Sequence, residues 1–201
     1  MNPVLEPAAL ILAAGASSRM GRPKPLLKLE GETFLDRLII RFSGICGPVI
    51  VVLGYGAEQV RAGIAHGDLA EIVINPAPER GMLSSLQCGL RHAPADVEAV
   101  LFTPVDLPSI QPATIALLAR TQATVAIPLF EGRKGHPVRV SRQVMDELLA
   151  LPQEAKASDV IHRHSADLID TGDPGILYDV DTPKDYEALV RKSEVGSREP
   201  E

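Results

Sequence analysis

The chain has 201 residues, of which 45% are hydrophobic and 3% aromatic, and its formal net charge is -6 at pH 7. This length predicts one domain over residues 1–192, and the polar segment 193–201 is expected to be a disordered tail. The acidic balance argues against a general surface for nucleic acid or for an anionic membrane. The N-terminal apolar run is too short to cross a bilayer and follows no basic leader, which predicts a cytoplasmic protein.

Apolar runs alternate with helical patterns through the first half of the chain. Buried strands are predicted at 9–14, 48–53, 70–75 and 99–103, and helices at 33–42, 57–65, 83–92 and 112–120. This alternation predicts an α/β fold, a three-layer sandwich with a mostly parallel, Rossmann-like mixed sheet. Because right-handed crossovers bring the carboxyl ends of parallel strands to one edge, we expect ligands to bind there.

The second half of the chain is less regular. A strand at 123–128, a turn at 131–135 and a returning strand at 136–140 predict a hairpin that adds a mixed edge to the sheet. Helices are predicted at 142–149 and 157–164, and a late strand at 176–180. Thr182 as cap and Pro183 in the first position then predict the start of a last helix.

The loop after the first strand combines glycines with basic side chains. Residues 12–27 read LAAGASSRMGRPKPLL. Glycines allow backbone N–H groups to approach an anion, and Arg19 and Lys24 can reach different phosphates. The spacing matches neither GxxxxGK[ST] nor GxGxxG, which excludes two other phosphate loops. An ordinary basic surface loop is the alternative to a nucleotide loop, whose expected contacts are Leu12, Ala13, Ala14, Gly15, Ser17, Ser18, Arg19, Gly21 and Lys24.

The segment LAAGASSRMGRPKPLL resembles the signature of the MobA/MocA-like nucleotidyltransferases, which include molybdenum-cofactor cytidylyl- and guanylyltransferases. Further matches lie at 75–86 (NPAPERGMLSSL), 104–108 (PVDLP), 135–138 (GHPV) and 179–186 (DVDTPKDY). The resemblance implies a fold of the nucleotide-diphospho-sugar transferase type. It also implies Mg²⁺-dependent transfer of a nucleoside monophosphate from an NTP to a phosphorylated small-molecule acceptor, with Arg19, Lys24 and Asp106 as the catalytic residues.

Two aspartates are expected to bind the metal. Asp106 follows the fourth predicted strand, where a carboxylate suits Mg²⁺, and the resemblance implies the same role. Capping of the next helix is the alternative for Asp106. The resemblance points to Asp179 as the second ligand. On an extended segment, the side chain of Asp181 points to the same face as that of Asp179. Asp181 also precedes Thr182, so it equally suits a role at the helix start.

The resemblance places the 81–86 stretch near the nucleotide base and ribose. The expected contacts there are Asn75, Gly81, Ser84 and Ser85, although simple N-capping would also explain Ser84. His136, in the Gly-His-Pro turn, is implied on the acceptor side of the pocket. The residues alone leave open whether His136 contacts a ligand or braces its strand.

The opening AAG, the SSL helix start and the GHP turn resemble the cytidylyl branch more than the guanylyl branch, which usually carries AGG. The resemblance therefore favours CTP as donor, molybdopterin as acceptor and transient contact with a molybdoenzyme or its chaperone. The loop at 104–108 departs from that branch, which often has Asp-Gln-Pro, and this leaves the acceptor open. The alternatives are a sugar phosphate or another small phospho-alcohol as acceptor, or a non-catalytic nucleotide-binding or cofactor-chaperone protein.

Overall fold

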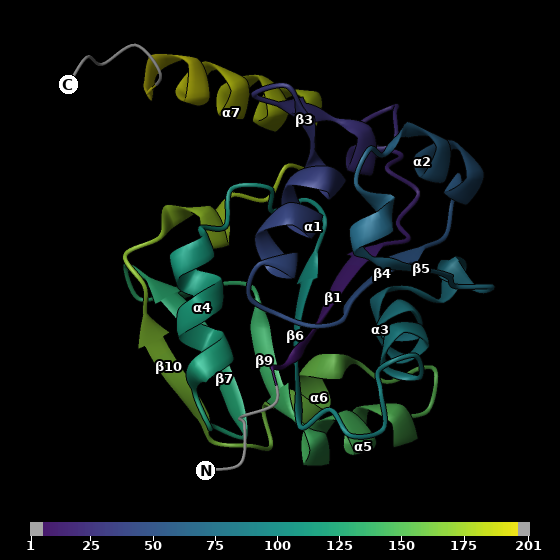
Figure 1. Ribbon diagram of the computed structural model, residues 1–201, viewed down its shortest axis with the longest axis vertical. Coiled ribbons are helices and arrows are strands. Elements are labelled where there is room, and N and C mark those ends of the chain that lie inside the picture. Colours follow the sequence, from purple (N-terminus) through teal and green to yellow (C-terminus); the bar gives the residue numbers. More distant parts are fainter. Residues whose placement is uncertain (1–5, 197–201) are drawn as a thin grey trace.

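The computed structural model describes residues 6–196 and shows a central sheet with helices on both faces (Figure 1). The sheet has eight strands in the order β10-β7-β9-β6-β1-β4-β5, and β8 pairs with β7. β9 runs antiparallel to β6 and β7, whereas β1 is parallel to both of its neighbours. The predicted α/β fold with a mostly parallel mixed sheet is confirmed. The strands are β1 (Ala8–Ala13), β4 (Val49–Leu53), β5 (Glu71–Ile74), β6 (Ala99–Pro104), β7 (Val125–Phe130), β8 (Arg133–Lys134), β9 (Val138–Ser141) and β10 (Ala166–Asp170).

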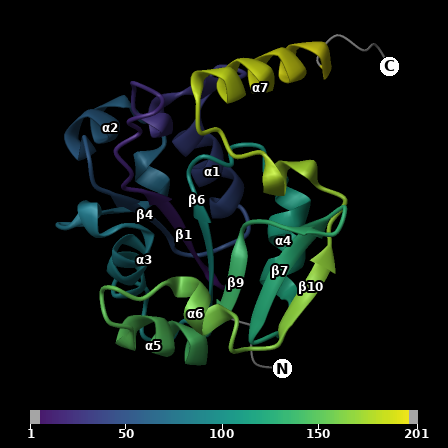
Figure 2. The same ribbon diagram turned by 180° about the vertical axis from the view of Figure 1, so that it is seen from behind.

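Seven α-helices are present in the described residues. Their hydrophobic faces form two cores, one on each side of the sheet. Helices α1, α2, α4 and α7 pack with the first core, and α3, α5 and α6 with the second. Figure 2 shows the second group from the opposite side. The helices are α1 (Phe34–Ser43), α2 (Ala57–Gly63), α3 (Met82–Leu90), α4 (Pro112–Arg120), α5 (Arg142–Ala150), α6 (Ala157–Ile161) and α7 (Pro183–Gly196).

Strand β1 shows why the chain folds in three layers. All of its residues are buried, and successive side chains alternate between the two cores. Leu10 and Leu12 face the core under α3 and α5, while Ile11 faces the core under α1. A strand with both faces covered reads as a continuous apolar run, as this segment does. Among residues 6–196, no helix combines the length and apolar character needed to span a membrane.

The late part of the chain differs from the sequence expectations at β10, at 176–180 and at 193–196. Strand β10 was not predicted because three of its five residues are exposed and its sequence, ADLID, is partly polar. The predicted strand at 176–180 is wrong, because the chain forms the 3-10 helix η4 (Pro174–Leu177) and then an irregular stretch. Residues 193–196, assigned to a disordered tail, continue α7, and 197–201 lie outside the described residues. The other short elements are η1 (Lys24–Leu26), η2 (Gly67–Leu69), η3 (Pro78–Arg80), β2 (Lys28–Leu29) and β3 (Glu32–Thr33).

Candidate functional site

The loop after β1 is closed by hydrogen bonds centred on Ser17. The carbonyl oxygen of Ser17 accepts hydrogen bonds from the N–H groups of Met20 and Gly21, at 3.0 and 3.2 Å. Its hydroxyl accepts from the N–H of Lys24 at 3.0 Å. Ser17 and Gly21 both adopt positive φ, 52° and 70°, and Gly21 does so at little steric cost. Ser17 thereby folds the loop and places Lys24 at the start of η1.

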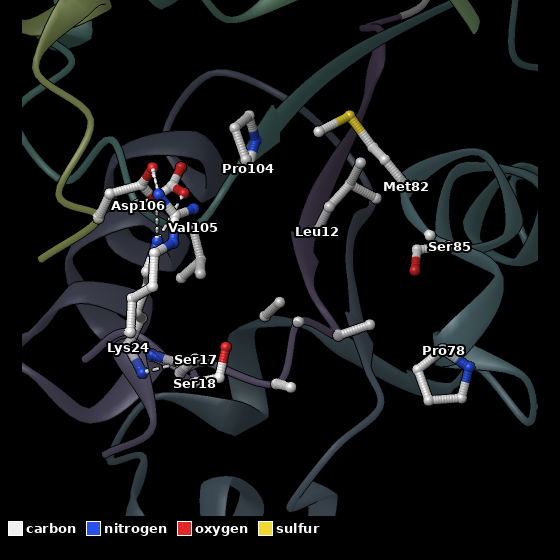
Figure 3. Close-up of a pocket in the computed structure, with 18 residues that line it drawn as sticks. Leu12, Ser17, Ser18, Lys24, Pro78, Met82, Ser85, Pro104, Val105 and Asp106 are labelled. Carbon is white, nitrogen blue, oxygen red and sulfur yellow. Dashed lines mark hydrogen bonds and ion pairs between the residues drawn. The ribbon is translucent and has the colours of Figure 1, made fainter. Parts of the chain in front are cut away.

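Lys24 links two carboxylates that are distant in sequence. Its ammonium Nζ lies 3.2 Å from Oδ2 of Asp106 and 2.5 Å from Oδ1 of Asp181 (Figure 3). The guanidinium of Arg19 pairs with the other oxygen of Asp181 at 2.8 Å. The pKa of Asp181 is lowered, mainly by its hydrogen bond to Lys24 and further by the charges of Lys24 and Arg19. Desolvation of the carboxylate opposes this shift but does not reverse it. Both carboxylates therefore converge on a single cation.

The sheet places Asp106 at this position. Strand β6 is parallel to β1, and the N–H of Val105 donates to the carbonyl of Leu12 at 3.1 Å, one step beyond the paired strands. The carbonyl of Asp106 accepts from the N–H of Val180 at 2.9 Å. This bond brings the segment before α7, with Asp181, to the carboxyl edge of the sheet. Both aspartates therefore lie beside the loop that follows β1.

These groups form one end of a cavity of about 350 Å³. Figure 3 shows Lys24 and Asp106 on one wall, with Met82, Ser85 and Pro78 across from them. Charged groups thus occupy one wall and mainly apolar groups the other. The cavity is lined by Leu12, Ala13, Ala14, Gly15, Ala16, Ser17, Ser18, Arg19, Lys24, Pro25, Pro78, Gly81, Met82, Ser85, Pro104, Val105, Asp106 and Asp181.

Most of the residues singled out from the sequence line this cavity. Gly21, Asn75, Ser84, His136 and Asp179 lie outside that lining. Sequence reasoning missed the apolar wall, because single prolines and small residues carry no chemical signal before the fold brings them together. The lining residues that it did not select are Ala16, Pro25, Pro78, Met82, Pro104, Val105 and Asp181.

Asn75 supports the cavity from behind. It is 3% exposed, and its amide nitrogen donates to the hydroxyls of Ser84 and Ser85 at 3.0 and 3.1 Å. Its amide oxygen accepts from the N–H of Ala77 at 3.0 Å. These bonds hold the start of α3 against the end of β5. Asn75 and Ser84 therefore brace the site, and Ser85 lines it.

His136 lies at the start of the returning strand and is half-buried. Its Nδ1 is 3.4 Å from the carbonyl oxygen of Phe102, and its ring meets the edge of the Phe102 ring with centroids 6.0 Å apart. Burial lowers the pKa of His136, and the Phe102 hydrogen bond and the charge of Asp106 oppose that shift. These contacts agree with the bracing role among the two that the sequence left open.

The geometry brings Asp181, and not Asp179, to the cluster. The extended strand expected at 176–180 is replaced by η4 and a tight turn in which the N–H of Asp179 donates to Leu177 at 3.1 Å. Asp179 is exposed, whereas Asp181 contacts Lys24. The start of α7 carries reciprocal bonds: the carboxylate of Asp185 accepts from the N–H and hydroxyl of Thr182 at 2.8 and 2.7 Å, and the hydroxyl of Thr182 accepts from the N–H of Asp185 at 3.3 Å. Thr182 and Asp185 therefore cap the helix, while the carboxylate of Asp181 contacts Lys24 and Arg19.

The donor set of Asp106 and Asp181 suits a hard divalent cation. Their oxygens already share one ammonium ion, so they point at one volume of space. Within residues 6–196, no group of three or more His, Cys, Asp or Glu side chains could hold a metal ion. Mg²⁺ typically takes one or two carboxylates and completes its coordination with phosphate oxygens and water. Asp106 and Asp181, which face one volume of space beside the cavity, supply the two carboxylates of such a donor set.

Comparisons with known proteins find relatives over most of the chain. Residues 9–168 match the family model described as the MobA-like NTP transferase domain. A molybdenum cofactor cytidylyltransferase from Escherichia coli K12 is 28% identical over 181 residues, covering 88% of this chain and 92% of the relative. A probable molybdenum cofactor guanylyltransferase from Bacillus cereus G9842 is 27% identical over 167 residues, covering 75% and 76%. Relatives of both kinds therefore match most of the chain.

Solved structures share the fold. Rv0371c from Mycobacterium tuberculosis H37Rv superposes with a TM-score of 0.83 at 29% identity, covering 94% of this chain and 99% of that one. A complex of Rv0371c with manganese has a TM-score of 0.79 at 26% identity, covering 92% and 98%. The 2-C-methyl-D-erythritol 4-phosphate cytidylyltransferase of Thermus thermophilus has a TM-score of 0.71 at 19% identity, covering 94% and 100%, and shows the fold alone.

Proposed function

Since the chain belongs to the MobA-like NTP transferase family, we propose that it transfers a nucleoside monophosphate from an NTP to a phosphorylated acceptor. One observation carries this proposal. Arg19 and Lys24, from the loop after β1, meet Asp106 and Asp181 at one end of a cavity of about 350 Å³. Two cations serve the phosphates and two carboxylates serve a divalent metal. A protein that only bound a nucleotide would not require the complete set.

The reaction joins two anions, so charge neutralisation and alignment dominate its barrier. An oxygen of the acceptor phosphate forms a bond to the α-phosphorus, and the bond from that phosphorus to the bridging oxygen breaks. Pyrophosphate then leaves with the electron pair. Arg19 and Lys24 stabilise negative charge on the phosphate oxygens, and the loop around Ser17 presents backbone N–H groups beside them. Asp106 and Asp181 would hold Mg²⁺, which would supply further neutralisation of the triphosphate.

Lys24 has to change partners during binding. In the structure its ammonium neutralises both carboxylates. A triphosphate that enters the cavity competes for Lys24 and Arg19, which frees the aspartate oxygens. We therefore expect nucleotide and divalent cation to bind together more tightly than either binds alone. Lys24 and Arg19 thus exchange carboxylate partners for phosphate partners when the nucleotide and the metal ion bind.

We propose CTP as the preferred donor and molybdopterin as the preferred acceptor. The donor preference is supported by the AAG form of the loop, in which Ala14 lines the cavity. Relatives named for either nucleotide match the chain, so the preference depends on the AAG, SSL and GHP motifs. The product of such a transfer serves molybdoenzymes, and we include transient contact with a molybdoenzyme or its chaperone in the proposal.

Pyrophosphate release tests the function directly. The purified protein is incubated with Mg²⁺, each of the four NTPs in turn, and molybdopterin, a sugar phosphate or a phospho-alcohol. We expect release with CTP and molybdopterin, and none from the Asp106→Asn variant. Release with a sugar phosphate alone would replace the proposed acceptor. Thermal stabilisation by nucleotides without any pyrophosphate release would instead support a non-catalytic binding protein.

A further inference from the structure

The segment 173–181, here called the strap, crosses the carboxyl edge of the sheet between β10 and α7 and can be followed in Figure 2. It passes between two other segments at very short range. A Cβ atom on Gly175 would collide with the carbonyl of Ser109, and one on Gly135 would collide with the carbonyl of Ile176. The N–H of His136 also donates to the carbonyl of Ile176 at 3.3 Å. The strap is therefore closely fitted on both sides.

Asp173 anchors the start of the strap. It is 1% exposed, although it carries a carboxylate. Its Oδ2 accepts from the N–H of Gln111 and the hydroxyl of Thr114, both at 2.8 Å. Its Oδ1 accepts from the N–H of Gly175 at 2.8 Å. A buried carboxylate is tolerated when donors satisfy it in this way, and here it caps the start of α4 from a separate element.

Arg41 holds the same loop from the opposite side. Its guanidinium, on α1, donates to the carbonyls of Pro108 and Ile110 at 2.9 and 2.6 Å. Burial lowers the pKa of Arg41, and nearby carboxylates, including that of Asp173, oppose this shift. Loop 106–111 is thus bonded to a half-buried cation, Arg41, and to a buried anion, Asp173.

The loop and the strap each carry one carboxylate of the proposed metal site. Loop 106–111 begins with Asp106, and the strap ends with Asp181. The two segments are tied at one end by Asp173 with Gln111, and at the other by Val180 with the carbonyl of Asp106. The relative placement of the two aspartates is therefore set by these two ties.

We infer that Asp173 is a positioning residue that holds Asp106 and Asp181 at the spacing a divalent cation requires. The inference rests on the proposed function, since it concerns the same site. Asp173 acts through the strap and does not line the cavity. We expect substitution of Asp173 to weaken metal affinity, and to lower turnover only because less metal is bound. Residues that support metal ligands from outside typically change metal affinity about 10- to 100-fold when mutated.

Asp173→Asn breaks one side of this anchor. Asparagine has a single acceptor oxygen, so its NH₂ group must face either the N–H of Gly175 or the donors of Gln111 and Thr114, and the bonds on that side are lost. Thr114→Val is the matched control, because it removes another bond of the same carboxylate and leaves the tie to Gly175 intact. Thermal melts establish that each variant is folded at the assay temperature.

The measurement is Mn²⁺ affinity in the presence of CTP, followed by the electron paramagnetic resonance of free Mn²⁺. We expect affinity to fall about tenfold or more in Asp173→Asn and less than about twofold in Thr114→Val. Saturating metal should restore kcat in Asp173→Asn to within about twofold of the unmodified protein, since the chemical groups remain. Equal Mn²⁺ affinity in folded Asp173→Asn and the unmodified protein would overturn the inference.

A second variant covers the case in which Asp173→Asn does not fold. Gly175→Ala keeps the Asp173 side chain but displaces the strap, because the added Cβ would clash with the carbonyl of Ser109 and with Oδ1 of Asp173. It should weaken Mn²⁺ binding to a similar degree, and unchanged affinity would overturn the inference. Asp106→Asn distinguishes a failure of this inference from a failure of the proposed metal site. If that variant binds Mn²⁺ as well as the unmodified protein does, the proposed metal site is wrong and the inference fails with it.

Discussion

Lys24→Ala probes the centre of the proposed site. The substitution removes an ammonium that contacts carboxylates at 3.2 and 2.5 Å. The three side chains are 12%, 23% and 30% exposed, so water can partly replace the lost partner, and Arg19 still pairs with Asp181. Loss of such ion pairs costs about 1 kcal/mol or less in folding free energy. Loss of a group that stabilises charge in the transition state typically costs about 10²- to 10³-fold in kcat.

The expected result is therefore a large loss of turnover with a small change in thermal stability. Pyrophosphate release and thermal unfolding are measured on the same preparations. Lys28→Ala is the matched control, because Lys28 is an exposed lysine near the same loop and its ammonium lies outside the cluster. It should retain activity within about twofold. Full turnover in Lys24→Ala, or an equal loss in both variants, would refute the assignment of Lys24 to the phosphates.

The remaining predictions concern the second carboxylate and the base. Asp181→Asn should reduce metal-dependent turnover by about 10²-fold or more, while Asp179→Asn should change it less than about threefold; the reverse order would restore Asp179 as the ligand. Lys24 lowers the pKa of Asp181, so its ion pairs stabilise the fold above about pH 4 and are lost as pH falls through the lowered value. The melting temperatures of Asp181→Asn and the unmodified protein should consequently converge in acid. Ala14→Gly removes a methyl group from the cavity wall and should raise kcat/KM for GTP relative to CTP by several-fold, about 1 kcal/mol or more, as measured by pyrophosphate release.

The sequence was sufficient for the parts of the site that follow buried strands directly. The run of apolar residues in β1 marks where the loop begins, and Asp106 follows the apolar run of β6 by two residues. In a mostly parallel sheet the ends of these strands meet at one edge, so local pattern and general topology already place them together. The family resemblance stated from these motifs is confirmed by the match over residues 9–168.

The sequence failed where a residue's position depends on irregular backbone. Alternation along an extended segment predicts Asp179 and Asp181 on one face, and the resemblance favours Asp179 of the two, but η4 and the turn before Asp179 break that alternation. The pattern ILYDV has the apolar character of a strand, and tertiary contacts of the strap override it. Strand β10 was missed for a related reason, since a partly exposed edge strand lacks a hydrophobic pattern and forms because β7 offers a free edge for pairing.

By itself, then, the sequence determined the fold class, the position of the basic loop after β1 and the carboxylate at the end of β6, because each depends on residues close together in the chain. Only the tertiary structure decided which late aspartate joins Lys24, since that pair is separated by 157 positions. It likewise revealed Asp173, whose donor at Gln111 is 62 positions away. Such contacts arise when the strap packs between loop 106–111 and the β7–β9 hairpin, and no local pattern encodes that packing.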